Sequence, residues 1–232
     1  MPNGAADRVR WVEVAPERLA GWLDSFAQRH GDVVLEPGRE AVAFLAADGA
    51  VAECHVPFPP LAGVSAAGPA ARGAVAEAAT RICGHALAAR TVGVLLVRLG
   101  GYAAGVFTGP DAELAASKVG SRLVHGRSAA GGTSQHRFAR RREKQARQAL
   151  GAAADTAAAV FAPFAGRLDA VVLGGDRRAI AGLRDDPRLK PFFDVAVERF
   201  LAVPDPRLAV LRGTPRLFRA IRIRLTEPTP PG

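Results

Sequence analysis

The sequence predicts a mixed α/β fold, in which a mixed sheet flanked by helices follows a small N-terminal α+β unit. Three observations carry this prediction. Thr91–Leu99 is nearly continuously apolar, as expected of a central strand buried on both faces. Residues 136–160 form a long alanine-rich segment with helical periodicity. Short apolar runs that alternate with turns and helical segments follow it, as in β/α units.

The N-terminal elements predict a small α+β unit over residues 1–57. Arg8–Val14 alternates and predicts a strand, and Pro16 opens a helix that runs to about Arg29. The next three apolar runs predict strands at 32–36, 41–46 and 51–56, joined by turns at Pro37-Gly38 and Asp48-Gly49.

In the middle of the chain, three predicted strands precede a glycine-rich loop. Residues 58–90 are expected to form a Pro/Gly/Ala linker and then a helix over 70–90. After the buried strand 91–99, Gly100-Gly101 turns the chain into a hairpin partner at 102–107, and 117–124 is a third strand.

A long helix and further β/α units complete the larger domain, which is predicted to cover residues 91–226. The helix has a narrow small-residue stripe that includes Ala153 and Ala157 and suits close packing on a sheet. Later strands are expected at 169–173, 193–201 and 218–225. The proline-rich tail, 227–232, is expected to fray.

Positive charge is concentrated between Lys118 and Gln148. This stretch holds nine Lys/Arg residues and one acid, Glu143, a balance of +8, whereas the whole chain is +9. With a pI near 11.0, this suits a nucleic-acid partner, although an acidic protein or a membrane surface would also attract it.

Several other kinds of site are not supported. Cys54 and Cys83 each have a histidine nearby, but their spacing matches no zinc signature, so neither a metal nor a cofactor is expected. Gly174-Gly175-Asp176 is read as a plain βα connection, and Asp185-Asp186 as a turn. No signal peptide or membrane span is evident, which predicts a cytoplasmic protein that does not bind membranes.

The loop and helix at 125–148 resemble a known family. Gly131-Gly132, followed by Arg137-Phe138-Ala139-Arg140-x-Arg142, is similar to the catalytic loop and helix of the middle domain of eukaryotic and archaeal class-one peptide release factors. In those factors glutamine follows the glycines directly, whereas here Thr133 does and the glutamine is Gln135. This displacement resembles the bacterial, actinobacterial-type branch of the VLRF release-factor-like family, and the likeness covers roughly residues 90–226.

The resemblance implies a ribonuclease-H-like sheet, a role in ribosome quality control and a set of site residues. Gln135 is the expected catalytic residue, because an amide can orient a water molecule although it does not titrate. Its alternative role is that of a solvated helix residue. The expected catalytic loop also contains Gly131, Gly132, Thr133, Ser134 and His136, and the expected RNA-binding residues are Arg127, Arg137, Arg140, Arg141, Arg142, Lys144 and Arg147.

Three functions remain open from the sequence. The leading one is a peptidyl-tRNA hydrolase that frees stalled nascent chains from the large ribosomal subunit, with peptidyl-tRNA and ribosomal RNA as partners and no DNA. The second is a tRNA-acceptor-end endonuclease that gives the same release. The third is a tRNA- or ribosome-binding module without catalysis, whose binding would weaken steeply with salt.

Overall fold

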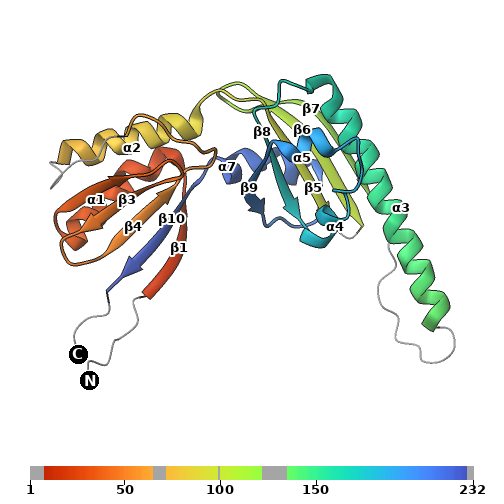
Figure 1. The fold of residues 1–232 in the computed structure, drawn as a ribbon, viewed down its shortest axis with the longest axis horizontal. Helices are drawn as coiled ribbons and strands as arrows, with labels where there is room; N and C mark the ends of the chain where they lie inside the picture. The colour runs from red at the N-terminus through yellow and green to blue at the C-terminus, as the bar shows by residue number, and fades with distance from the viewer. Residues whose placement is uncertain (1–7, 65–71, 99, 122–134, 229–232) are drawn as a thin grey trace. The chain divides into compact units, whose positions relative to one another are not determined.

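The computed structural model describes residues 8–64, 72–98, 100–121 and 135–228, and gives only the backbone for Arg72 and residues 135–142. It divides into two compact units. Unit 1 comprises residues 1–88 together with 219–232, and unit 2 comprises residues 89–218. Figure 1 shows the elements of both units. No helix of the described residues is long and apolar enough to cross a bilayer.

Unit 1 is built on an antiparallel five-stranded sheet with the order β1-β10-β4-β3-β2. Its elements are β1 (Arg8–Val14), the 3-10 helix η1 (Pro16–Arg18), α1 (Leu19–His30), β2 (Val33–Pro37), β3 (Ala41–Ala46), β4 (Val51–His55), α2 (Arg72–Leu87) and β10 (Ile221–Glu227).

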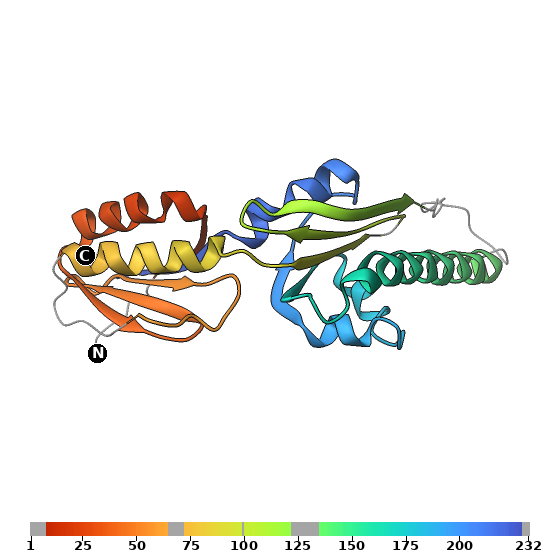
Figure 2. The same cartoon turned by 90° about the horizontal axis from the view of Figure 1, so that it is seen from above.

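The core of unit 1 lies between one face of this sheet and the two helices. Figure 2 shows α1 and α2 side by side over the sheet. Leu23 and Phe26 of α1 and Ile82 of α2 are buried against alternate strand residues such as Val42 and Phe44. Because side chains alternate between the faces of a strand, only one face of each strand enters this core.

The C-terminal strand joins unit 1, which differs from the sequence-based expectation that it belongs to the larger domain. Strand β10 pairs with β1 on one side and with β4 on the other. Its alternate residues Ile221, Ile223 and Leu225 are buried in the core of unit 1. The helix α2, which the sequence predicted after a linker and outside the N-terminal unit, packs on the same core because its apolar face covers the sheet.

Unit 2 contains the predicted buried strand and the long helix. Its elements are β5 (Val92–Arg98), β6 (Gly101–Thr108), β7 (Glu113–Ser121), α3 (Gln135–Phe161), the 3-10 helix η2 (Ala162–Phe164), β8 (Ala170–Gly175), α4 (Arg177–Ala181), α5 (Lys190–Asp194), β9 (Ala196–Leu201), α6 (Leu208–Arg212) and α7 (Thr214–Phe218).

The sheet of unit 2 is mixed and has the order β7-β6-β5-β8-β9. Strand β6 is antiparallel to β5 and β7, whereas β5, β8 and β9 are parallel. When the strands of unit 2 are numbered by their order in the chain, they lie in the sheet in the order 3-2-1-4-5, and only the second strand is antiparallel to the others. This is the expected ribonuclease-H-like arrangement. The mixed α/β prediction is therefore confirmed.

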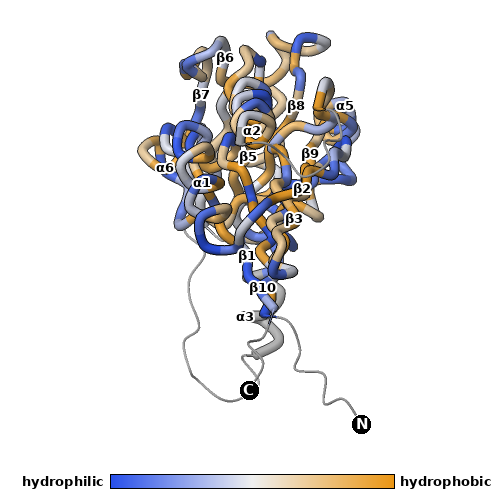
Figure 3. The backbone as a smooth tube through the Cα atoms, turned by 90° about the vertical axis from the view of Figure 1, so that its left-hand side faces the viewer, coloured by the Kyte–Doolittle hydropathy of each residue, from blue (hydrophilic) through white to orange (hydrophobic). Residues whose placement is uncertain are grey.

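Helices cover both faces of this sheet (Figure 2). On one face, Ala153, Ala157 and Phe161 of α3 pack with alternate strand residues such as Leu95 and Val171. Phe161 approaches the sheet closely, because a Cβ on Gly93 would lie 3.3 Å from its ring. On the other face, Phe218 of α7 contacts Phe107, with ring centroids 5.8 Å apart. Hydrophobic stretches follow β5 and β8 in Figure 3.

Some strand boundaries differ from the prediction. Strand β7 begins at Glu113 rather than at residue 117, because its first residues pair with the end of β6 across a register shift at Val106/Phe107. The segment predicted as one strand over 193–201 begins within α5, and only 196–201 is strand β9. Phe192 in α5 is buried in the core, so burial rather than strand pairing explains this apolar run.

Candidate nucleic-acid interface

The long helix α3 has an anchored half and an overhanging half. At a rise of about 1.5 Å per residue, its 27 residues span about 40 Å. Buried side chains begin at Ala153, and Leu150 is half-buried against the core. Lys144, Arg147 and Gln148 are exposed. Figures 1 and 2 show the N-terminal half of α3 extending past the strands of unit 2.

The described part of the overhanging half presents positive charge to solvent. Arg147 Nη2 lies 3.3 Å from Glu143 Oε1, one helical turn away, and both side chains are about two-thirds or more exposed, at 73% and 67%. Such an exposed pair is weak, because water screens it. No carboxylate among the described residues lies within 4.0 Å of Lys144. Arg147 and Lys144 are therefore available to an anionic partner.

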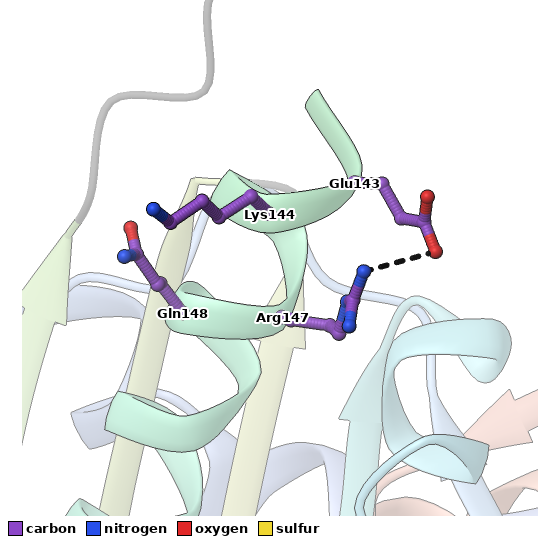
Figure 4. A pocket seen from close by; sticks show the side chains of 4 residues that line it. All are labelled: Glu143, Lys144, Arg147 and Gln148. Carbon is purple, nitrogen blue, oxygen red and sulfur yellow. Dashed lines mark ion pairs between the residues drawn. The ribbon is translucent and has the colours of Figure 1, made fainter. Parts of the chain in front are cut away.

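These side chains line a shallow surface hollow. It is bordered by Glu143, Lys144, Arg147 and Gln148, all from α3. In Figure 4, Lys144 and Gln148 extend from one side of the helix, and the Glu143–Arg147 ion pair lies on the other. A hollow with walls from one helix is too open to enclose a small ligand, and it suits contact with an extended surface instead.

The structure places the remaining predicted residues only in part. Gln135 and His136 are the first two residues of α3, so the helix begins at the predicted catalytic glutamine. Arg137, Arg140, Arg141 and Arg142 follow in its first two turns, where the backbone is helical. The predicted residues Arg127, Gly131, Gly132, Thr133 and Ser134 lie outside the described residues.

One edge of the unit 2 sheet lies at the same end as the overhanging half of α3. The register pairs Arg98 with Gly101 and Gly101 with Ser121, and it pairs Val97 with Gly175. The ends of β5, β7 and β8 therefore share this edge, which we call the carboxyl edge. Phe161, at the other end of α3, packs by Gly93 near the start of β5. The helix thus runs from the carboxyl edge to the opposite edge.

A tight turn holds charged residues at the carboxyl edge. Gly175 has a φ of 98° and leads from β8 into α4. A Cβ there would clash with Val97 O and lie 3.0 Å from Arg98 Cγ, so only glycine fits. The Asp176 carboxylate then caps α4 by accepting from Arg178 N at 2.7 Å and Ala179 N at 3.2 Å.

The sequence reasoning did not single out the arginines of this edge. Arg98 is the last residue of β5, Arg177 and Arg178 begin α4, and Arg207 precedes α6. Pro206, the neighbour of Arg207, lies by Gly101, since its Cδ is 3.4 Å from a Cβ built there. For Arg98, Arg177 and Arg178 the available signal was their position at or just after the end of a strand, because the carboxyl ends of parallel strands meet at one edge.

The cysteines and their neighbouring histidines take structural positions in unit 1. Cys54 is fully buried, and burial raises the pKa of its thiol. Cys83 Sγ donates to Pro16 O at 2.8 Å, and His85 Nε2 lies 2.6 Å from Phe58 O. Among the described residues, no cluster of three or more His, Cys, Asp or Glu side chains could hold a metal ion.

The strand order of unit 2 is the ribonuclease-H-like topology that the resemblance to release-factor middle domains implies. The sequence model of the family described as "Actinobacteria/chloroflexi VLRF1 release factor" matches residues 90–224, which is more than half of the chain. The chain belongs to this VLRF1 release factor family. Its matched region begins just before β5 and ends within β10.

Solved structures show more distant similarity. The archaeal translation termination factor aRF1 matches with a TM-score of 0.42 at 13% identity, over 93% of this chain and 68% of that chain. A structure described as "Vms1 mitochondrial localization core" matches with a TM-score of 0.33 at 11% identity, over 78% and 75%. Archaeoglobus fulgidus Pelota matches with a TM-score of 0.31 at 12% identity, over 93% and 67%. No curated protein matches.

Proposed function

We propose that this protein is a cytoplasmic, ribosome-associated hydrolase that releases stalled nascent chains from peptidyl-tRNA on the large subunit. The observation that carries the proposal is the beginning of α3 at Gln135, which follows the Gly131-Gly132 pair closely in the sequence, on a helix that overhangs its own sheet. A projecting helix end can enter a narrow site that the body of the domain cannot. The basic residues of α3 would follow the RNA backbone toward that site.

The proposed reaction is hydrolysis of the ester that joins the peptide to the tRNA. The oxygen of a water molecule attacks the ester carbonyl carbon, the bond from that carbon to the terminal ribose oxygen breaks, and a proton passes to the ribose oxygen. The Gln135 amide cannot remove a proton, so its contribution is to hold the water through one donor and one acceptor. Proton transfer would use groups of the RNA substrate or the ribosome.

The start of α3 offers a second contribution to this reaction. The first four backbone N–H groups of an α-helix have no acceptor within the helix. The positive end of the helix dipole adds to their attraction for a developing negative charge. Their expected role is to stabilise the oxyanion that forms when water attacks. The first turn contains no acidic residue that would oppose this.

The test uses purified large subunits that carry peptidyl-tRNA with a labelled peptide. Wild-type protein is expected to release the peptide, and Gln135→Ala is expected to slow release by about 100-fold, because misplacing the attacking group costs about that factor. Gln28→Ala is the matched control, since Gln28 is an exposed glutamine on helix α1 of unit 1. This control should release peptide at the wild-type rate.

Sequencing the 3′ end of the product tRNA then identifies the bond that is broken. An intact CCA end supports ester hydrolysis. A shortened end would show that the protein cleaves the RNA strand and not the ester. If neither wild type nor Gln135→Ala releases peptide while both bind the subunits, the protein is a binding module and the proposal of catalysis is wrong.

A further inference from the structure

The carboxyl edge of unit 2 carries arginines close to the overhanging half of α3. We name Arg98, Arg177, Arg178 and Arg207 the carboxyl-edge arginines. Leu150 of α3 contacts the end of α4, because its Cδ1 lies 3.1 Å from a Cβ built on Gly182. Arg147 is three residues before Leu150, less than one helical turn away. The exposed face of α3 and the helix α4 are therefore neighbours.

We propose that the carboxyl-edge arginines form a second contact surface for the phosphate backbone of RNA, continuous with α3. This inference rests on the proposed function and extends it, because it gives the RNA a second, laterally separated set of contacts. A single helix can bind a strand yet leave it free to rotate about the helix axis. Contacts from the ends of neighbouring strands would fix the direction in which the RNA crosses the domain.

The Arg177 guanidinium is held in place, and no described carboxylate neutralises it. Arg177 lies over the Phe200 ring, with its Cζ 4.3 Å from the centroid, so its side chain is ordered by stacking. No carboxylate among the described residues lies within 4.0 Å of Arg177, Arg178 or Arg207. A guanidinium over an aromatic face still has N–H groups in its own plane that point outward past the ring, where a phosphate can accept from them.

Arg98 is held more firmly than the others. Its Nη1 donates to Val203 O at 2.8 Å, and its Nε lies 3.8 Å from Asp205 Oδ1. The Asp205 side chain is 74% exposed, so this distant pair is largely screened by water. Arg98 thus supports the edge structurally and adds to its positive potential, which makes it unsuitable as the test position.

The distribution of charge along the sheet favours an anionic partner at this edge. The carboxyl edge has four arginines against Asp176 and Asp205, a balance of +2, and residues 135–148 of α3 add six cations and one acid, a balance of +5. The opposite edge carries three acids, Asp111, Glu113 and Asp169, against Arg90 and Arg167. The overhanging half of α3 extends away from this edge. Positive charge is therefore concentrated at the end where α3 overhangs.

The experiment measures binding of the full chain to tRNA with an intact CCA end over a range of KCl concentrations. Arg177→Gln with Arg178→Gln is the edge variant. The matched control is Arg212→Gln with Arg216→Gln, which removes the same charge from exposed positions of α6 and α7 on the other face of the sheet. Thermal unfolding of each variant verifies that it folds.

The edge variant is expected to raise the Kd roughly tenfold and to reduce the slope of log K against log salt by about 1 to 2, as for one or two lost phosphate contacts. The control pair should change both quantities much less. Arg177→Lys with Arg178→Lys, which keeps the charge, should restore most of the salt slope. If the edge and control variants weaken binding equally, the second surface does not exist.

A parallel binding series with large subunits that lack tRNA separates the two sources of RNA phosphate. Loss of affinity for tRNA alone assigns the edge to the acceptor arm, and loss for the subunits alone assigns it to ribosomal RNA. In the peptide-release assay, the edge variant should need more protein than the control variant to reach half of its maximum rate. If wild type releases peptide and the edge variant matches the control throughout, only this inference fails. If wild type neither binds RNA at low salt nor releases peptide, the proposed function fails as well.

Discussion

Arg188 links the anchored half of α3 to the loop before α5. Its Nη2 lies 2.7 Å from Asp186 Oδ2, its Nε donates to Asp186 Oδ1 at 3.0 Å, and its Nη1 lies 2.9 Å from Asp155 Oδ1 on α3. Two parallel bonds to one carboxylate make this pair more specific in geometry than a single surface contact. The arrangement ties α3 to unit 2 at a position well behind its overhanging half.

This ion pair predicts a dependence of stability on pH. The hydrogen bonds from Arg188 hold the pKa of Asp186 below its usual value. A lowered pKa in the folded state stabilises the protein above about pH 4, the unfolded value, and the stabilisation is lost as pH falls through the folded value.

Asp186→Asn should therefore lower the free energy of unfolding by less than about 1 kcal/mol at pH 7, since the pair is partly exposed. The difference from wild type should shrink toward pH 3. Urea unfolding at several pH values measures it, and Asp185→Asn, at an exposed neighbouring position, is the control. A difference that stays constant with pH would contradict this role of Asp186.

At the scale of elements, the two halves of α3 differ in composition and in role. Its C-terminal half carries small residues, and Ala153 and Ala157 are fully buried on the sheet. Its N-terminal half is dense in arginine and begins at Gln135. Small side chains let the helix axis lie close to the strands, which fixes the direction of the overhanging half. The anchored half thereby positions the end that we propose to be catalytic.

Two substitutions in the anchored half of α3 should have opposite effects. Ala157→Leu adds volume where the side chain is fully buried, and it should lower the free energy of unfolding by about 1–3 kcal/mol. Gly151→Ala should raise it by about 0.5–1 kcal/mol, because a Cβ at Gly151 meets no atom within 4 Å and alanine favours the helix. Urea unfolding followed by circular dichroism measures both. Destabilisation by Gly151→Ala would show that α3 is strained or contacted at this position.

At the scale of the whole molecule, the chain leaves unit 1 after residue 88 and returns to it at residue 219. The returning strand β10 lies between β1 and β4, inside the sheet rather than at its edge. Unit 2 is thus inserted between two strand-forming parts of unit 1, and both ends of the described chain lie in unit 1. A deletion of residues 1–57 would leave β10 and α2 without the rest of their sheet. The remaining part of unit 1 would then be misfolded, so this deletion does not report the role of unit 1.

This topology predicts which fragments fold. Residues 89–218 contain their own sheet and core, so this fragment should unfold cooperatively on its own. Residues 1–88 alone lack β10, which leaves β1 and β4 without their shared partner, and this fragment should not fold stably. Adding residues 219–228 through a flexible linker should restore cooperative unfolding, measured by circular dichroism. A stable 1–88 fragment would show that β10 is dispensable.

Much of the element order follows from the sequence because local patterns encode it. Alternation identifies β1, apolar runs between turns identify β3 and β4, and the continuous apolar run of β5 identifies a strand buried on both faces. The helix was predicted to start at residue 136 and begins at Gln135. The segment before β9 was harder, because an apolar run such as that around Phe192 can be buried in a short helix as well as in a strand.

The candidate site could likewise be proposed only in part from the sequence. Gln135 and the basic residues up to Arg147 could be proposed from one stretch, because a contiguous motif keeps its spacing in any fold. Arg98, Arg177 and Arg207 are far apart in the sequence and become neighbours of one edge only through the strand order. No local pattern reports that order, since it depends on which strands pair.

By itself, the sequence determined the mixed α/β class, the long basic helix and the family resemblance, because periodicity, charge density and motif spacing are local properties of the chain. Only the tertiary structure decided that β10 completes the first sheet and that α3 overhangs the carboxyl edge of the second. The physical reason is that strand pairing and burial join residues that are distant in sequence. Those long-range contacts set both the boundaries of the two units and the direction in which the N-terminal half of α3 extends past its sheet.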